Sequence, residues 1–133
     1  MTVELRQQKG TVLLLVVFVV ALFSTAVMGI LQINTEEVQL MQNHVYMAEA
    51  QAIAEAGLND ALAQLHHDST WIDGFTDKAF ASGTYRVSVD GRTVTSVGTT
   101  RQGFVSRVEA DLSLSQGNNG TYNIVIIAMR VNE

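Results

Sequence analysis

The 133-residue chain contains no cysteine and no proline, and it is poor in basic residues. Without cysteine, disulfides, thiolate catalysis and cysteine-ligated metal sites are excluded. The absence of proline suits long uninterrupted helices and strands, because proline cannot donate a backbone hydrogen bond to either. Only 8 Lys and Arg stand against 13 Asp and Glu, and the net charge is −5. An acidic chain without clustered basic residues gives no electrostatic reason to expect a nucleic-acid partner.

One long apolar segment, Thr11 to Leu31, dominates the first quarter of the chain. It carries no charge, and 14 of its residues are Val, Leu, Ile or Phe. A helix of this length covers about 31 Å, close to the ~30 Å hydrocarbon core of a bilayer. We therefore predict a membrane-spanning helix over residues 11–31.

The charges on either side of this segment predict its orientation. Arg6 and Lys9 precede it, and the next basic residue is Lys78. Acidic residues, beginning with Glu36 and Glu37, follow it instead. The positive-inside rule places the N-terminus in the cytoplasm and the chain after Leu31 outside it.

Three interpretations of the N-terminus fit this pattern to different degrees. The first is a signal peptide cleaved after Ala26, but the apolar run is longer than a signal-peptide core of 7–15 residues. The second is an uncleaved membrane anchor. The third is a prepilin-type leader, a short basic peptide that ends in Gly10 and is cut immediately before the apolar helix.

The segment Arg6 to Leu31, followed by Ala48-Glu49-Ala50 and Ala54-Glu55-Ala56-Gly57-Leu58, resembles the N-terminal half of PilX-type minor type IV pilins. It is also similar to the minor pseudopilins of type II secretion. The resemblance implies that a prepilin peptidase cleaves between Gly10 and Thr11, and that Thr11 becomes N-methylated. It implies other pilin or pseudopilin subunits as partners. It also implies an inner-membrane location, with the external domain in the periplasm or in a filament.

One residue departs from the pattern of the major pilins. Most of them carry Glu at the fifth mature position, which is Leu15 here. In the family, that carboxylate is thought to pair with the N-terminal ammonium of a neighbouring subunit as the filament grows. Leu15 therefore argues against a major structural subunit. The resemblance to secretion pseudopilins that also lack this Glu implies that such a subunit can still occupy the filament tip or an initiating complex.

Helical periodicity continues from residue 32 to residue 66. Apolar residues recur there at three- and four-residue spacing, which predicts a face packed against the protein's own later domain; they are Val38, Met41, Val45, Ala48 and Ala52, then Leu58, Leu62 and Leu65. Gly57 costs about 1 kcal/mol relative to Ala inside a helix, and it marks either a bend or a close contact.

After the helix, residues 67–83 form a linker in which Trp71, Phe75 and Ala79 recur every four residues. This spacing predicts a short helix or a packed loop, with an aromatic patch for a partner as the alternative. Residues 84–133 then alternate with period two and predict four antiparallel strands, with Asp90-Gly91 as a hairpin turn. The last strand, Tyr122 to Val131, is apolar on both faces. It is therefore either a central strand or one with a face that meets another protein.

No constellation of catalytic, cofactor-binding or metal-binding residues emerges from the sequence. Adjacent His66 and His67 point in different directions and make a poor metal pair. We therefore expect no enzyme and no cofactor. The two periodicities predict an α+β fold, a long N-terminal helix packed on a four-stranded antiparallel sheet, and the resemblance implies that this fold is pilin-like. Five segments are predicted: a leader peptide (1–10), the transmembrane part of the helix (11–31), its external amphipathic part (32–66), a linker (67–83) and a four-stranded antiparallel domain (84–133).

The function that this organisation favours is a structural one. A minor pilin or pseudopilin would prime or join a type IV pilus or a type II secretion filament. The alternative is a single-pass, membrane-anchored envelope binding module with a small β domain.

Overall fold

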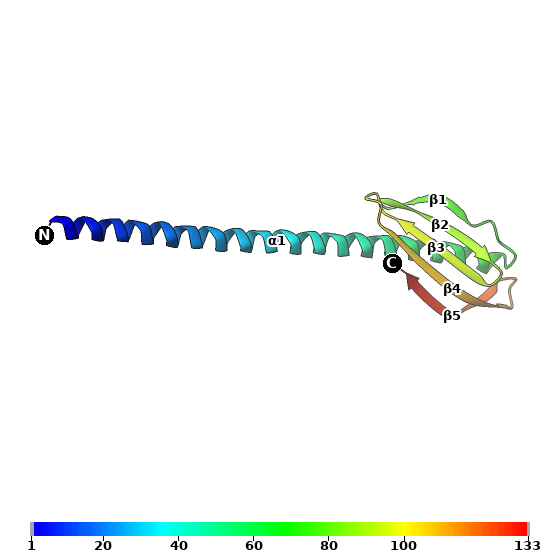
Figure 1. The fold of residues 1–133 in the computed structure, drawn as a ribbon. Coiled ribbons are helices and arrows are strands. Elements are labelled where there is room, and N and C mark those ends of the chain that lie inside the picture. The colour runs from blue at the N-terminus through cyan, green and yellow to red at the C-terminus, as the bar shows by residue number, and fades with distance from the viewer. Residues whose placement is uncertain (1, 133) are drawn as a thin grey trace. The chain divides into compact units, whose positions relative to one another are not determined.

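The computed structural model describes residues 2–132, with side chains described from Gln8 onward, as one helix and five strands (Figure 1). The elements are α1 (Thr2–His67), β1 (Phe75–Phe80), β2 (Gly83–Asp90), β3 (Thr93–Thr99), β4 (Val105–Gln116) and β5 (Tyr122–Asn132). The predicted α+β class, a long N-terminal helix with an antiparallel sheet, is confirmed, although the sheet has five strands instead of four. The chain divides into two compact units, Met1–Gln42 and Asn43–Glu133.

The first unit is helical throughout its described residues. Its large apolar side chains are exposed on every side, and none of the residues in the most apolar stretch of α1 is buried. Within residues 12–31, two residues carry a hydroxyl group, and each hydroxyl forms a hydrogen bond with the backbone of the same helix. Ser24 donates to the Val20 carbonyl at 2.8 Å, and Thr25 donates to the Ala21 carbonyl at 2.9 Å. No polar side chain of residues 12–31 therefore needs water as a partner.

The second unit is built around one face of α1. Its buried helical residues recur at three- and four-residue spacing; they are Ala50, Ile53, Ala54, Leu58, Ala61 and Leu65. They pack on the inward side chains of β2, β3 and β4, among them Val87, Val94 and Val108. In Figure 1 this part of α1 crosses behind the strands.

Two glycines allow the helix to approach the sheet closely. A Cβ added to Gly98 of β3 would lie 2.4 Å from the Ala50 carbonyl oxygen and 2.4 Å from the Ala54 nitrogen. A Cβ added to Gly57 of α1 would lie 2.4 Å from the Ser96 hydroxyl. Gly57 therefore marks a close contact between helix and sheet.

The sheet is a simple meander in the order β1-β2-β3-β4-β5, and each strand is antiparallel to the next. The predicted turn at Asp90-Gly91 is confirmed. Asp90 pairs with Thr93, and Gly91 has a φ of 60°, a left-handed conformation that glycine adopts without a steric penalty.

The predicted linker over residues 67–83 is wrong in one respect, because it contains β1 and no helix. β1 pairs with β2 from Phe75↔Val87 to Phe80↔Gly83, with an irregularity between Phe75 and Lys78 where Asp77 has a φ of 46°. The four-residue spacing was misleading. The backbone groups along the edge of β2 form hydrogen bonds with a neighbouring strand, which a helix could not supply.

The predicted buried stripe on the external helix is only partly correct. Leu58 and Leu65 are buried and Leu62 is partly buried, but the earlier members of the stripe are exposed; these are Val38, Met41, Val45, Ala48 and Ala52. The face that meets the sheet is instead centred on Ala50, Ala54 and Gly57. Small side chains let the helix backbone reach β3, whereas Val and Met would hold it away.

Of the two alternatives predicted for the last strand, a central position in the sheet is excluded. β5 pairs with β4 on one side and forms an edge of the sheet on the other. Its apolar character on both faces is therefore not explained by burial within the described part of the chain.

Candidate processing and assembly site

The predicted cleavage site lies within α1 and is open to its surroundings. Gly10 and Thr11 are both exposed, and a Cβ added to Gly10 would meet no atom within 4 Å. Lys9, immediately before them, is exposed as well. Arg6, the other basic residue of the predicted leader, lies outside the residues whose side chains are described.

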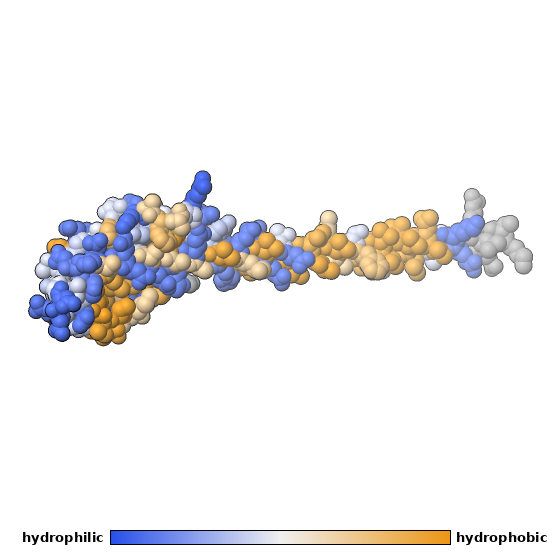
Figure 2. Space-filling view, turned by 180° about the vertical axis from the view of Figure 1, so that it is seen from behind, coloured by the Kyte–Doolittle hydropathy of each residue, from blue (hydrophilic) through white to orange (hydrophobic). Residues whose placement is uncertain are grey.

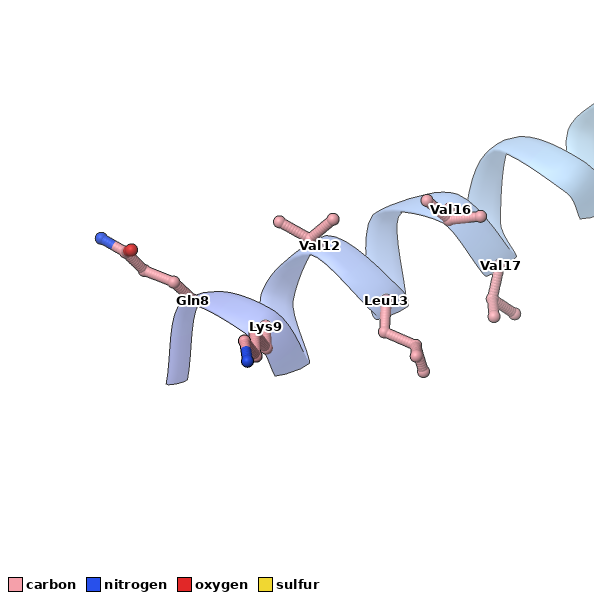
Figure 3. Close-up of a pocket in the computed structure, with 6 residues that line it drawn as sticks. All are labelled: Gln8, Lys9, Val12, Leu13, Val16 and Val17. Carbon is pink, nitrogen blue, oxygen red and sulfur yellow. The ribbon is translucent and has the colours of Figure 1, made fainter. Parts of the chain in front are cut away.

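The surface around this site is formed by one helix alone. Figure 3 shows a shallow hollow lined by Gln8, Lys9, Val12, Leu13, Val16 and Val17. Val12 and Val16 project from one side of the helix, and Leu13 and Val17 project from the other. All six belong to consecutive turns of α1, so no second element encloses a ligand here. The hollow offers apolar contact to a neighbouring helix or to lipid.

The apolar segment keeps this character from Thr11 to Leu31. Leu15, at the position where a carboxylate was expected in a major pilin, is 61% exposed. Leu31 at the far end is 60% exposed. A helix that is apolar all round is stable only within an apolar environment. By length and composition, α1 can therefore cross a membrane.

A polar cluster joins α1, β1 and β2 in the second unit. The Asp60 carboxylate accepts hydrogen bonds from the Lys78 ammonium and, at 2.5 Å, from the Tyr85 hydroxyl. The Lys78 nitrogen also lies 4.5 Å from the centre of the Phe75 ring, within the range of a cation–π contact. Asp60 therefore ties the β1–β2 hairpin to the helix.

The pKa shifts in this cluster favour a structural ion pair. The bonds from Lys78 and Tyr85 lower the pKa of Asp60. The bond to Asp60 raises the pKa of Lys78. Burial, followed by the bond to Asp60, raises the pKa of Tyr85. The carboxylate thus stays ionised while its two donors keep their protons. The lowered pKa makes Asp60 a weaker base, and the raised pKa values of Lys78 and Tyr85 disfavour their nucleophilic forms.

The histidines at the end of α1 have structural contacts. The Nδ1 atom of His66 lies 2.6 Å from the Tyr122 carbonyl oxygen at the start of β5, and the rings of His66 and His67 are 5.8 Å apart. Among the described residues, no group of three or more His, Asp or Glu side chains is placed to hold a metal ion.

Sequence reasoning did not anticipate the Asp60–Lys78–Tyr85 cluster. Its signal was weak, because Lys78 belongs to a segment that was expected to be a linker. The available hint in the sequence was the aromatic residues Trp71 and Phe75 in that segment; in the structure their rings lie 5.1 Å apart and pack against the core.

These geometries and the sequence pattern carry the functional argument. Comparison of the chain with protein-family models, curated proteins and solved structures gave no match.

Proposed function

We propose that this chain is a structural subunit, a minor pilin or pseudopilin, that primes or joins a type IV pilus or a type II secretion filament. One observation carries the proposal. Directly after Gly10, the chain presents an uncharged helical segment whose apolar side chains find no partner within the chain's described residues.

The mechanism would be assembly through this helix. At roughly −0.3 to −0.6 kcal/mol each, its 14 strongly apolar residues favour a membrane by about 4–8 kcal/mol. Removal of residues 1–10 would leave Thr11 as the new N-terminus. The helix would then exchange lipid for the helices of neighbouring subunits, and its apolar surface would stay buried throughout the exchange.

Leu15 supports a minor role within such a filament. A subunit without a carboxylate at this position cannot attract the N-terminal ammonium of a neighbour by charge. It would rely on apolar packing alone, which suits a subunit that starts or ends a filament. Its partners would be other pilin or pseudopilin subunits, the prepilin peptidase and the membrane.

Intact-mass analysis of the membrane-extracted chain tests the proposal. The expected product begins at Thr11 and carries one added methyl group. A Gly10→Val variant, expressed beside the prepilin peptidase, should keep the leader, because a branched side chain replaces the hydrogen at the cleavage site. Gly29→Val is the matched control, and it should be processed normally.

Two outcomes contradict the proposal. If the natural chain still begins at Met1 or Thr2, the anchored binding module becomes the better explanation. If the product begins at Val27, the chain is a secreted protein released by a signal peptidase.

A further inference from the structure

The connection between β4 and β5 carries the one Asn-Gly pair of the sequence, Asn119-Gly120. The Gly117 nitrogen donates a hydrogen bond to the Thr121 carbonyl at 2.8 Å and closes the base of this connection. Residues 118–120, which lie between them, are all exposed. In Figure 1 the connection projects from one end of the sheet, and Figure 2 shows hydrophilic surface at that end of the second unit. The Asn-Gly pair is therefore open to water.

The backbone at Gly120 leaves room for a reaction between the two residues. Its φ of 76° is left-handed, and a Cβ added there would meet no atom within 4 Å. Glycine has no side chain to shield its own nitrogen, so this nitrogen can approach the Cγ atom of Asn119. Among the residues that the structure describes, none forms a hydrogen bond that would hold the Asn119 side-chain amide elsewhere. A five-membered ring can therefore close between the two residues.

We propose that Asn119 is a site of spontaneous deamidation. The Gly120 nitrogen attacks Cγ of Asn119 and forms a new N–Cγ bond, while the Cγ–Nδ2 bond breaks. The departing amide group takes the proton of the Gly120 nitrogen and leaves as ammonia. The only other reactant is water, and the proposal does not depend on the assembly function proposed above.

Water then opens the cyclic imide in one of two ways. Attack at Cγ gives aspartate with the original backbone. Attack at the backbone carbonyl carbon gives isoaspartate, in which the chain runs through the former side chain and gains one carbon atom. Both products place a new negative charge in the connection between β4 and β5.

The other asparagines of the chain are placed less favourably. Five of them lie in α1 or β5; they are Asn34, Asn43, Asn59, Asn123 and Asn132. The backbone hydrogen bonds of a helix or strand oppose the rotation that ring closure needs. Asn118 shares the exposed connection, but the side chain of Asn119 hinders access to the nitrogen that follows it. We therefore expect the reaction at Asn119 and not at its neighbour.

Two Asp-Gly pairs could form the same ring, but neither is as well placed. A Cβ added to Gly74, after Asp73, would lie 2.2 Å from the Val87 carbonyl oxygen, so this backbone is enclosed. Asp90 pairs with Thr93 in the sheet. A carboxylate is also a poorer target for a nucleophile than an amide. Ring closure at aspartate releases water, which ring opening restores, so these pairs cause no change in mass.

Peptide mass spectrometry of the full-length chain tests the proposal. Trypsin cuts after Arg107 and Arg130, so a single peptide, residues 108–130, carries Asn118, Asn119 and Asn123. The chain is incubated in detergent at neutral and at alkaline pH, sampled over time and digested at mildly acidic pH. We expect the change from amide to acid at Asn119 to be at least tenfold faster than at the other two asparagines. The rate should rise with pH, because hydroxide removes the proton of the attacking nitrogen.

Three variants separate the chemistry from the fold. Asn119→Gln requires a six-membered ring and should abolish the fast reaction. Gly120→Ala places a methyl group beside the attacking nitrogen and should slow the reaction at least tenfold. Asn118→Gln is the matched control and should leave the rate at Asn119 unchanged. The urea transition of Trp71 fluorescence verifies that the second unit stays folded in all three variants.

Each of three other outcomes overturns the proposal. Absence of the mass change in the folded chain, whether or not urea permits it, would mean that the connection prevents ring closure. Equal rates at Asn118, Asn119 and Asn123 would mean that the Asn-Gly pair is no special site. Asn119-Gly120-Thr121 also fits the acceptor sequence for N-glycosylation. A sugar found on Asn119 of the natural chain would block the amide and exclude deamidation there.

Discussion

The Tyr85 hydroxyl donates a hydrogen bond to the Asp60 carboxylate at 2.5 Å, joining β2 to the helix across the edge of the core. The Tyr85 ring is buried, so replacement by Phe keeps the packing and removes only this bond. Asp60 retains its bond from Lys78 and is partly exposed, which limits the loss. We expect Tyr85→Phe to lower the free energy of unfolding by about 1–2 kcal/mol.

The single tryptophan provides the measurement for this change. Trp71 packs on Phe75, whose ring lies 6.0 Å from that of Tyr85, so its fluorescence reports unfolding of the second unit. Urea titration in detergent, with Tyr122→Phe as control, should show the loss only for Tyr85→Phe. Equal effects of the two substitutions would contradict the assigned bond.

Acid should weaken the second unit through Asp60. Its pKa is lower in the folded chain than in the unfolded chain, because Lys78 and Tyr85 donate to its ionised form. The resulting stability is present above the unfolded pKa of about 3.9 and is lost as the pH falls through the folded value. We expect Asp60→Asn to flatten the stability profile below about pH 4. Hydrogen bonds from the hydroxyl and the backbone nitrogen of Thr70 also lower the pKa of Asp68. Asp68 should therefore account for the pH dependence of stability that remains in Asp60→Asn. An unchanged profile in Asp60→Asn would contradict the assignment.

Gly57→Ala tests the close approach of helix and sheet. Alanine is the better helix former by about 1 kcal/mol, so propensity alone predicts a gain. The new Cβ would instead lie 2.4 Å from the Ser96 hydroxyl and 2.8 Å from the Tyr85 ring. Overpacking of this kind costs about 1–3 kcal/mol, so we expect net destabilisation in urea titration. Gly29→Ala, where a Cβ meets nothing within 4 Å, should leave the tryptophan transition unchanged.

Ser106→Ala should stabilise the second unit. The Ser106 hydroxyl is buried beneath the helix and has no hydrogen-bond partner. Removal of an unpartnered buried polar atom relieves a desolvation penalty of about 1 kcal/mol. The midpoint of thermal unfolding should therefore rise. Ser88→Ala on the exposed side of β2 serves as the control and should stay within about 0.5 kcal/mol of the natural chain.

Leu15→Glu tests the proposed minor role. A carboxylate near the end of the span costs less than the roughly 2.5–3.5 kcal/mol of a central charge. The segment should therefore remain in the membrane. We expect the variant to be recovered in sheared filaments in larger amounts, because it gains a partner for the ammonium of a neighbour. Leu14→Glu, one residue away, should show no such gain.

The sequence was most informative where one periodicity dominated. The long helix and the Asp90-Gly91 turn each depend on local residue order, and both were predictable. The edge position of β5 was not predictable from the sequence. An apolar run has the same residue pattern whether it is covered by the chain itself or by another protein. The buried face of α1 was misassigned because close packing selected small residues, Ala50 and Ala54, over the larger Val45 and Met41.

The predicted processing residues Gly10 and Thr11 depend on a motif that is local in sequence, so reading the chain was enough to propose them. The Asp60 cluster required three elements to meet, and β1 had not been recognised as one of them. Polar contacts between distant segments depend on strand register, which a single sequence specifies only through its turns and its apolar pattern.

The meander order of the sheet has a consequence for how the second unit folds. Every strand pairs with its immediate neighbour in sequence, so the sheet can grow one hairpin at a time without bringing remote segments together. The second unit also contains no cysteine to oxidise and no proline to isomerise. The second unit can therefore complete its fold without oxidoreductases or prolyl isomerases, as soon as its last hairpin closes.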